Sequence, residues 1–217
     1  MFIGVNGIQL YYTKKGQGRQ LIMMHGNGED HTIFDEAVRV LKEHFTCYCV
    51  DSRGHGQSSP CRELHYKDMA QDMIAFMTEL DLENVAFYGF SDGGIVGLLV
   101  AMSCSRVTNL VVSGANITTK GTKWWFRVFL KGMSIRKKDP LIELMKNEPS
   151  ISTAELSAIR VKTLVIAGSK DLIREEETRA IADAIPEARL MILKGEKHGS
   201  YVVHSTKIAD ILADELQ

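Results

Sequence analysis

The hydrophobic positions along this chain follow two alternating patterns, short apolar runs and longer segments with apolar residues at helical spacing. The short runs predict strands at residues 20–24, 46–50, 85–88, 107–113, 162–167 and 189–193. The helical spacing predicts helices at residues 32–44, 66–80, 92–103, 174–184 and 200–215. This alternation is typical of a mostly parallel sheet with helices on both faces. The run "QLIMM" agrees with it, because a strand covered on both faces needs no polar residues.

The first residues predict an antiparallel hairpin ahead of this alternation. The alternating stretches "FIGV" and "IQLYYT" are separated by Asn6 and Gly7. Asn and Gly tolerate the positive φ angles of a two-residue turn, so the pair is a strong hairpin signal. Together with the later runs, the hairpin brings the expected sheet to about eight strands.

One long segment, residues 116–159, interrupts the alternation. It is too long for a single crossover between two strands, and its pattern predicts roughly two or three short helices. We interpret it as a small helical cap inserted into a single domain that spans residues 1–217. The length of the chain supports this interpretation, because 217 residues lie at the upper end of the range for one domain.

The first part of this segment is basic and aromatic. Between residues 119 and 147 it has eight basic and two acidic side chains, a local net charge of +6. The basic residues are Lys120, Lys123, Arg127, Lys131, Arg136, Lys137, Lys138 and Lys146, and the acidic ones are Asp139 and Glu143. The basic residues form either a solvated face or a surface for anionic substrates or lipids. In "WWFRVF", Trp124 and Trp125 are candidates to line a substrate pocket, although aromatic residues at helical spacing also simply pack a helix down.

Composition and charge disfavour several classes of partner. The formal net charge is −1, so no global attraction favours nucleic acid or an anionic membrane. The start "MFIGVNGIQLYY" has no cationic region followed by a long apolar segment, and no stretch reaches the roughly 18 apolar residues of a membrane span. We therefore expect a cytoplasmic protein without a membrane span.

The cysteines and most histidines are expected to have no metal-binding role. The chain has four cysteines without CxxC spacing or a secretory context: Cys47, Cys49, Cys61 and Cys104. Reduced thiols are expected for them, and neither disulfides nor a zinc site. His25 and His55 are expected to make structural hydrogen bonds in glycine-rich turns, and His31, His44, His65 and His204 to be ordinary surface or helix residues.

The stretch "GFSDGG" at residues 89–94 stands between a strand run and a helix run. A serine hydroxyl becomes a nucleophile only when a base takes its proton, and it must project to where a carbonyl group can reach it. A sharp turn from strand to helix presents Ser91 in this way, because Gly89 and Gly93 allow the helix and the strand to approach closely. The alternative is a glycine-rich turn with an incidental serine. We predict that Ser91 is a nucleophile.

A nucleophilic serine requires a histidine base and an acid that orients the histidine. In an open α/β sheet these residues lie in loops at the carboxyl ends of strands. Asp171 in "VIAGSKDLI" follows one predicted strand, and His198 in "MILKGEKHGS" follows the last one. Taken alone, the first is also explained as a helix cap and the second as a surface residue. Their occurrence together in the order Ser91, Asp171, His198 predicts a catalytic triad.

The oxyanion hole of such an enzyme is expected to consist of two backbone N–H groups. The residue after the nucleophile, Asp92, supplies one of them. The other falls in "HGNGED", where Asn27 or Gly28 can supply it and Asn27 is favoured. The alternative interpretation of this stretch is a glycine turn that leads into the next helix.

Five ordered motifs, "HGNG", "DSRGHGQS", "GFSDGG", "GSKD" and "KHGS", make the chain resemble the α/β-hydrolase fold superfamily from residue 20 onward. The resemblance implies a mostly parallel central sheet with helices on both faces. It also implies Ser91 as nucleophile, Asp171 as acid and His198 as base, with a mainly structural role for "DSRGHGQS". A haloalkane dehalogenase is disfavoured, because that chemistry uses a carboxylate nucleophile where this chain has serine.

The stretch that begins with "GFSDGG" and ends with "VVSGAN" looks most like biphenyl-hydrolase-like proteins of the valacyclovir hydrolase type. In that group the aspartate after the nucleophile helps to bind the ammonium group of α-amino acid esters, and the matching position here is Asp92. An acidic residue in a first helical turn also interacts favourably with the helix dipole, without any substrate. The short basic cap departs from the family, so substrate specificity does not carry over.

These residues predict a serine hydrolase of the carboxylesterase type, which cleaves an ester or related acyl bond of a small molecule without a metal or organic cofactor. Thioesterases, amidases, aminopeptidases and carbon–carbon hydrolases use the same triad. An alternative of a different class is a ligand receptor or signalling protein that keeps the triad and works by binding. The expected partner is a small-molecule acyl substrate and not nucleic acid, and the expected state is a monomer or homodimer.

Overall fold

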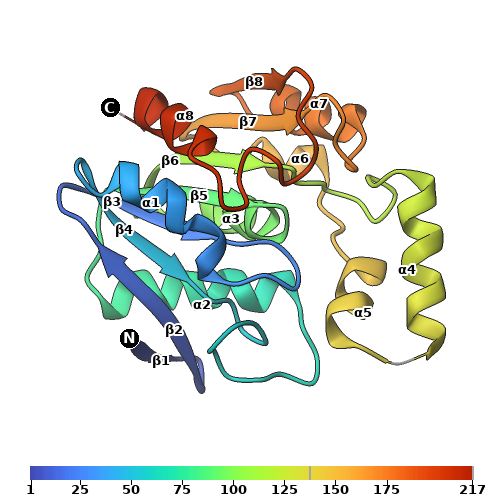
Figure 1. The fold of residues 1–217 in the computed structure, drawn as a ribbon, viewed down its shortest axis with the longest axis horizontal. Coiled ribbons are helices and arrows are strands. Elements are labelled where there is room, and N and C mark those ends of the chain that lie inside the picture. Colours follow the sequence, from blue (N-terminus) through green and yellow to red (C-terminus); the bar gives the residue numbers. More distant parts are fainter. Residues whose placement is uncertain (137, 217) are drawn as a thin grey trace.

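One sheet of eight strands runs through residues 1–136 and 138–216, which the computed structural model describes (Figure 1). The strands are β1 Phe2–Val5, β2 Ile8–Lys15, β3 Arg19–Met24, β4 Phe45–Val50, β5 Val85–Phe90, β6 Val107–Ser113, β7 Lys162–Gly168 and β8 Ala188–Leu193. Their order in the sheet is β1-β2-β4-β3-β5-β6-β7-β8. From β4 to β8 all neighbours in this order are parallel. The predicted mostly parallel sheet of about eight strands is confirmed.

The N-terminal hairpin forms the antiparallel edge of this sheet. Strands β1 and β2 pair around Asn6 and Gly7, whose φ angles are 45° and 78°. These positive values are the reason that the turn requires residues of this type. Strand β2 then pairs antiparallel with β4, which joins the hairpin to the parallel part of the sheet.

Helices cover both faces of the sheet. They are η1 His31–Phe34 (a 3₁₀ helix), α1 Asp35–Leu41, α2 Tyr66–Glu79, α3 Asp92–Ser103, α4 Trp124–Arg136, α5 Pro140–Asn147, α6 Thr153–Leu156, α7 Glu175–Ala184 and α8 Lys207–Leu216. Buried side chains of α1 and α8 form a hydrophobic core with one face of the sheet. Those of α2, α3 and α7 form a second core with the other face.

Two helices differ from their predicted bounds by more than one residue. The prediction of a helix over 200–215 is wrong in its first half, because residues 200–204 form turns and α8 begins only at Lys207. Tyr201 is fully buried in these turns, and His204 has a φ of 48° and donates its backbone N–H to the carbonyl of Ile33. The apolar residues of this segment therefore have the spacing of a helix but pack into the core from turns.

The helix predicted at 32–44 is divided and shorter. It consists of η1, whose first turn is capped by the carboxylate of Asp30, followed by α1, which ends at Leu41. The carbonyl of Lys42 accepts the N–H of Gln17 from the turn before β3. The helix ends here, and the Lys42 carbonyl is bonded to the turn before β3 in place of an N–H of a further helical turn.

The predicted cap region, residues 116–159, contains α4, α5 and α6. Figure 1 shows α4 and α5 beside the sheet and not on either of its faces. Its role as a cap on a single domain stays a prediction, and Lys137, one of its basic residues, lies outside the described residues. None of the helices in the described part of the chain is both long enough and apolar enough to cross a membrane.

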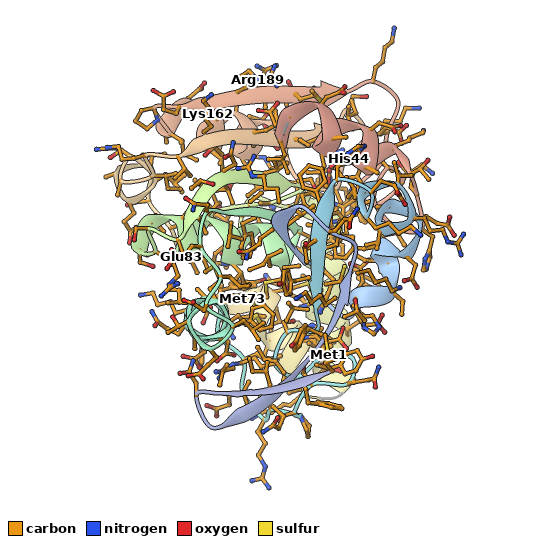
Figure 2. All side chains as sticks on the ribbon, turned by 90° about the vertical axis from the view of Figure 1, so that its left-hand side faces the viewer. Met1, His44, Met73, Glu83, Lys162 and Arg189 are labelled. Carbon is orange, nitrogen blue, oxygen red and sulfur yellow. The ribbon has the colours of Figure 1, made fainter. Side chains whose placement is uncertain are left out.

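The parallel strands all point toward the edge of the sheet where α4 and α5 stand. Figure 2 looks at the opposite edge, where the labelled residues His44, Glu83, Lys162 and Arg189 lie just before or at the start of β4, β5, β7 and β8. The loops that follow β3, β5, β7 and β8 therefore share one edge, which is where ligands bind in open α/β sheets.

A buried ion pair joins the loop after β4 to helix α2. The guanidinium group of Arg53 contacts both carboxylate oxygens of Asp72, at 2.6 and 2.7 Å. The Asp72 side chain is 2% exposed, and it also accepts a hydrogen bond from the amide of Asn6 in the hairpin turn. This pair therefore ties the "DSRGHGQS" segment and the hairpin to the same helix.

Replacement of the buried acid should destabilise the fold much more than replacement of an exposed one on the same helix. Asp72→Ala leaves the Arg53 guanidinium without its two close acceptors, which is expected to cost about 3 kcal/mol of unfolding free energy. Asp68→Ala is the matched control, because Asp68 is half exposed and contacts the same guanidinium at 3.4 Å. The control should lose less than about 1 kcal/mol. Urea unfolding measures both, and equal losses would contradict a dominant role for the Arg53–Asp72 pair.

Candidate active site

Ser91 occupies a sharp turn between β5 and α3. Its φ is 53°, in the region that residues other than glycine rarely adopt. A Cβ on Gly93 would lie 2.2 Å from the carbonyl oxygen of Met24, and one on Gly89 would lie 2.1 Å from the carbonyl oxygen of Gly93. Only glycine permits this approach of helix to strand, so the local sequence holds the Ser91 side chain at the carboxyl edge of the sheet.

The structure brings the three predicted triad residues together. His198, in the loop after β8, has its Nε2 3.1 Å from Ser91 Oγ. Its Nδ1 lies 2.7 Å from Oδ1 of Asp171, which follows β7 and is almost fully buried. With the proton on Nδ1 donated to the carboxylate, Nε2 is free to accept the serine proton.

Further contacts fix the acid and the base. Asp171 Oδ1 also accepts the backbone N–H of Ile173, at 2.9 Å. The His198 ring lies 5.0 Å from the ring of Phe90, and a Cβ on Gly114 would come within 2.8 Å of it. The imidazole is therefore held between an aromatic ring and a glycine that leaves room for it.

The two predicted oxyanion-hole residues also lie beside the serine. Asp92 is the first residue of α3, and Asn27 is in the loop after β3. The side-chain amide of Asn27 donates to Asp92 Oδ2 at 2.9 Å, so the two segments that carry the N–H groups are bonded to each other. Within residues 1–136 and 138–216, neither backbone N–H donates to another protein atom, which leaves both as donors for a ligand oxygen.

Glu29 is a residue of this site that sequence reasoning missed. Its carboxylate accepts the backbone N–H of Gly26 at 3.0 Å and closes the turn that carries Asn27. Burial raises the pKa of Glu29 above its ordinary value. The available signal was an acidic residue three positions after a glycine in "HGNGED", which is the reach of a side chain back to a backbone N–H in a capping box.

Asp92 is buried and doubly hydrogen-bonded. In addition to the Asn27 amide on Oδ2, the hydroxyl of Tyr66 donates to Oδ1 at 2.8 Å. Burial raises the pKa of Asp92, and the two hydrogen bonds oppose this shift by stabilising the carboxylate. Tyr66 begins α2, far from Ser91 in the sequence, and no local pattern indicated its place here.

A cavity of about 430 Å³ lies beside Ser91 and His198. Its apolar wall comes mainly from α4 and α5, through Phe126, Phe129, Leu130, Met133, Ile142 and Met145. Four carboxylates also line it: Glu29, Asp92, Asp139 and Glu148. Among the described residues no lysine or arginine lines the cavity, so its fixed charges are acidic apart from the histidine.

The tryptophans of "WWFRVF" do not line this cavity. Trp124 and Trp125 are 70% and 49% exposed, and Trp124 instead borders a second cavity of about 490 Å³, which Asp171 also lines. The predicted placement of both residues in the substrate pocket therefore differs from the structure. Helix α4 turns Phe126 and Leu130 toward the cavity beside Ser91, and the half-exposed Trp125 ring packs edge-on against Phe126, with 5.9 Å between the ring centroids.

A buried histidine joins two of the loops around the site. His25 is 1% exposed; its Nε2 accepts the backbone N–H of Ser52 and its Nδ1 donates to the carbonyl of Gly26. Burial, reinforced by nearby His55, lowers the pKa of His25 to about 4. A neutral ring fits both bonds, because a second ring proton would displace the Ser52 donor.

His31 is the first residue of the short helix η1 and is partly exposed. Its Nδ1 lies 2.8 Å from Oδ1 of Asp51, and Asp30, His31 and Asp51 place possible metal-ligand atoms within 4.8 Å of one another. The same Oδ1 accepts the backbone N–H of His31, and Oδ2 accepts that of Gln57. Through these bonds the Asp51 carboxylate holds the "DSRGHGQS" segment, of which it is the first residue, against the start of η1.

Comparison with known proteins adds independent information. A family model described as alpha/beta hydrolase fold matches residues 20–147. Serine hydrolase BPHL of Mus musculus is 26% identical over 99% of this chain and 85% of its own length. AB hydrolase superfamily protein YisY of Bacillus subtilis (strain 168) is 26% identical over 95% of this chain and 94% of its own. The enol-lactonase from Burkholderia xenovorans LB400 has a similar fold, with a TM-score of 0.84, 20% identity and coverage of 100% of this chain and 99% of that one.

Acidification should destabilise the fold through His25. Because its folded pKa of about 4 lies below the ordinary value of 6.5, the unfolded chain binds a proton between these values that the folded protein does not. This contribution to stability is complete above pH ~6.5 and is lost as the pH falls toward 4, with about 2 kcal/mol lost by pH ~5.

Urea unfolding of the wild type and of His25→Asn at neutral pH and at pH ~5 measures the effect. The pH-dependent loss should be smaller in His25→Asn by about the amount assigned to His25. His44→Asn, at an exposed position at the far edge of the sheet, should keep the full loss. The same pH dependence in His25→Asn and the wild type would show that another group is responsible.

Proposed function

The chain belongs to the α/β-hydrolase fold family, and from this premise we propose that it is a serine hydrolase that cleaves a carboxylic ester or related acyl bond of a small molecule. The observation that carries the proposal is one hydrogen-bonded chain: Ser91 Oγ to His198 Nε2 at 3.1 Å, and His198 Nδ1 to Asp171 at 2.7 Å. Nucleophile, base and orienting acid in contact are the requirement for activating a serine hydroxyl.

In the first half of the proposed reaction, His198 Nε2 takes the proton of Ser91 as Oγ attacks the carbonyl carbon of the substrate. The carbonyl oxygen becomes an oxyanion, which accepts hydrogen bonds from the backbone N–H groups of Asn27 and Asp92. Asp171 stabilises the imidazolium ion that forms on His198. The tetrahedral intermediate collapses when His198 gives its proton to the leaving alcohol, which leaves an acyl group on Ser91.

In the second half, a water molecule replaces the alcohol. His198 removes a proton from the water as its oxygen attacks the acyl carbonyl, and the same two N–H groups bind the second oxyanion. The proton then returns from His198 to Ser91 Oγ, the acid product leaves, and the starting protonation state is restored. Apart from the substrate and this water molecule, the groups that act in this scheme are side chains and backbone N–H groups of the chain itself.

The cavity beside Ser91 supports a small acyl substrate. Its volume of about 430 Å³ falls in the range of small-molecule sites, and its wall from α4 and α5 is apolar, as an acyl group requires. The leaving group is proposed to be an alcohol, which makes the enzyme a carboxylesterase.

The acidic lining of the cavity supports a further part of the proposal, a preference for esters that carry an ammonium group. Asp92 directly follows the nucleophile, and Glu29 lies in the neighbouring loop. Both oxygens of Asp92 already accept hydrogen bonds, but a carboxylate oxygen can accept more than one. An ammonium group nearby would also offset the burial that raises the pKa of Asp92.

Removal of the nucleophile should abolish both turnover and covalent labelling. Ser91→Ala is expected to lower kcat for p-nitrophenyl acetate and butyrate by about 10⁴-fold or more, because no alkoxide can form at this position. It should also abolish labelling by a fluorophosphonate, whereas His198→Ala should greatly slow it. Steady-state absorbance and gel fluorescence measure the two quantities.

Ser103→Ala is the matched control, because Ser103 lies at the other end of the same helix and is exposed. It should keep both activities. Fluorophosphonate labelling that persists in Ser91→Ala would contradict the assignment of the nucleophile. A single burst from the wild type without sustained turnover would favour a receptor over an enzyme.

Neutralisation of Asp92 should reduce the preference for cationic esters. Asp92→Asn is expected to lower kcat/KM for the p-nitrophenyl ester of valine about tenfold more than that for p-nitrophenyl isovalerate, which has the same shape without the amine. Parallel measurement of both substrates gives the ratio. Equal losses for the two esters would mean that Asp92 positions Asn27 and does not select the amine.

A further inference from the structure

Helix α4 presents an apolar face to solvent. The described residues include eight strongly exposed large hydrophobic side chains, and five of them lie on this helix. They are Trp124, Trp125, Val128, Phe129 and Met133, with exposed fractions between 41% and 70%. We call these five residues the outer face of α4.

The outer face is not the side by which the helix packs. Leu130 is 4% exposed, and Phe126 is partly buried beside it, so the opposite side of the helix already supplies the contacts with the protein. A surface helix normally turns its apolar stripe inward and its polar residues outward. Each residue of the outer face nevertheless keeps at least 41% of its surface exposed in the described part of the chain, and large contiguous apolar surfaces of this kind mark interaction sites.

The charged side chains on α4 and beside it in the sequence are mostly positive. Helix α4 has no acidic residue, and Lys131 is exposed next to Val128 along the helix. Lys120 and Lys138, on either side of the helix in the sequence, are exposed as well. The acidic side chains near this face already have partners. Asp139 caps α5, and Glu143 pairs with Lys146 at 2.8 Å. Glu175 and Glu176, which line a cavity together with Trp124, pair with Arg179 and Arg174.

We propose that the outer face of α4 docks on an anionic lipid surface. Tryptophan and phenylalanine favour the boundary between water and lipid, and an amphipathic helix with flanking lysines lies in that boundary when the lipids are anionic. A second copy of the chain fits less well, because a two-fold contact would bring like cations together. The net charge of the whole chain is only −1, so this attraction is local.

The position of α4 in the fold leaves its outer face accessible to a lipid surface. Figure 1 shows the helix beside the sheet at its carboxyl edge, away from both layers of helices that cover the sheet. Phe129 and Met133 belong to the outer face and also line the cavity next to Ser91. A docked lipid surface therefore borders the mouth of the cavity, which, if the proposed function holds, gives acyl compounds dissolved in the lipid access to Ser91.

The chain itself supplies the probe for this proposal. It has two tryptophans, Trp124 and Trp125, and both lie on the outer face of α4. Addition of vesicles of phosphatidylcholine and phosphatidylglycerol should shift their fluorescence to shorter wavelength and sediment the protein with the vesicles. Binding should be weaker to phosphatidylcholine alone, and it should weaken as salt screens the charges.

Two pairs of variants test the apolar and the charged contribution. Val128→Asp keeps both tryptophans and should weaken vesicle binding about tenfold, because it places a carboxylate in the middle of the face. Val40→Asp on α1 is its matched control, at a valine that is 41% exposed. Lys131→Glu should weaken binding about fivefold or more. Lys162→Glu, at the edge of the sheet that faces away from α4 in Figure 2, should bind as the wild type does.

Two results would overturn the proposal. One is the absence of both the fluorescence shift and co-sedimentation when the wild type meets anionic vesicles. The other is self-association in sedimentation velocity that Val128→Asp abolishes, without vesicle binding, which would assign the face to a second copy. Neither measurement depends on turnover, so failure of this proposal and failure of the hydrolase proposal are distinguishable.

Discussion

Parallel pairing of the strands is the constraint on which the candidate site depends. Because β3, β5, β7 and β8 run in the same direction, the loops after them emerge at one edge of the sheet. Asn27, Ser91, Asp171 and His198 each follow one of these strands, so residues far apart in the sequence meet without any long loop. The remaining contacts of the site orient side chains on the loops that these strands position.

Close contact at the Ser91 turn then couples the two halves of the site. Gly93 lies against the carbonyl of Met24, the last residue of β3, and donates its backbone N–H to the carbonyl of His25. The start of α3 is therefore held against the loop that carries Asn27, and the Asn27 side chain is also hydrogen-bonded to Asp92. Preorganised donors of this kind stabilise an oxyanion because little rearrangement is needed when the charge develops.

The parts of this arrangement that local sequence encodes could be predicted. Strand β6 and helix α3 have the predicted bounds, and the order of Ser91, Asp171 and His198 in the loops indicated their meeting. The contributions of Tyr66 and Glu29 could not be predicted in the same way, because they reach the site through contacts formed only in the folded chain. Periodicity also misjudged the residues around Tyr201 and the direction of Trp124, since apolar spacing does not say which side of a segment the core occupies.

Helix α4 has side chains that face both the solvent and the cavity, and this has a thermodynamic consequence. Phe129 and Met133 face the solvent with one part of their surface and the cavity with another. Whatever occupies the cavity and whatever covers the outside of the helix therefore touch the same two side chains. Ligands that share contacts in this way are linked, and linkage is reciprocal: a factor by which one changes the affinity for the other applies equally in the opposite direction. At these two positions a single layer of side chains separates the cavity from the surroundings of the molecule.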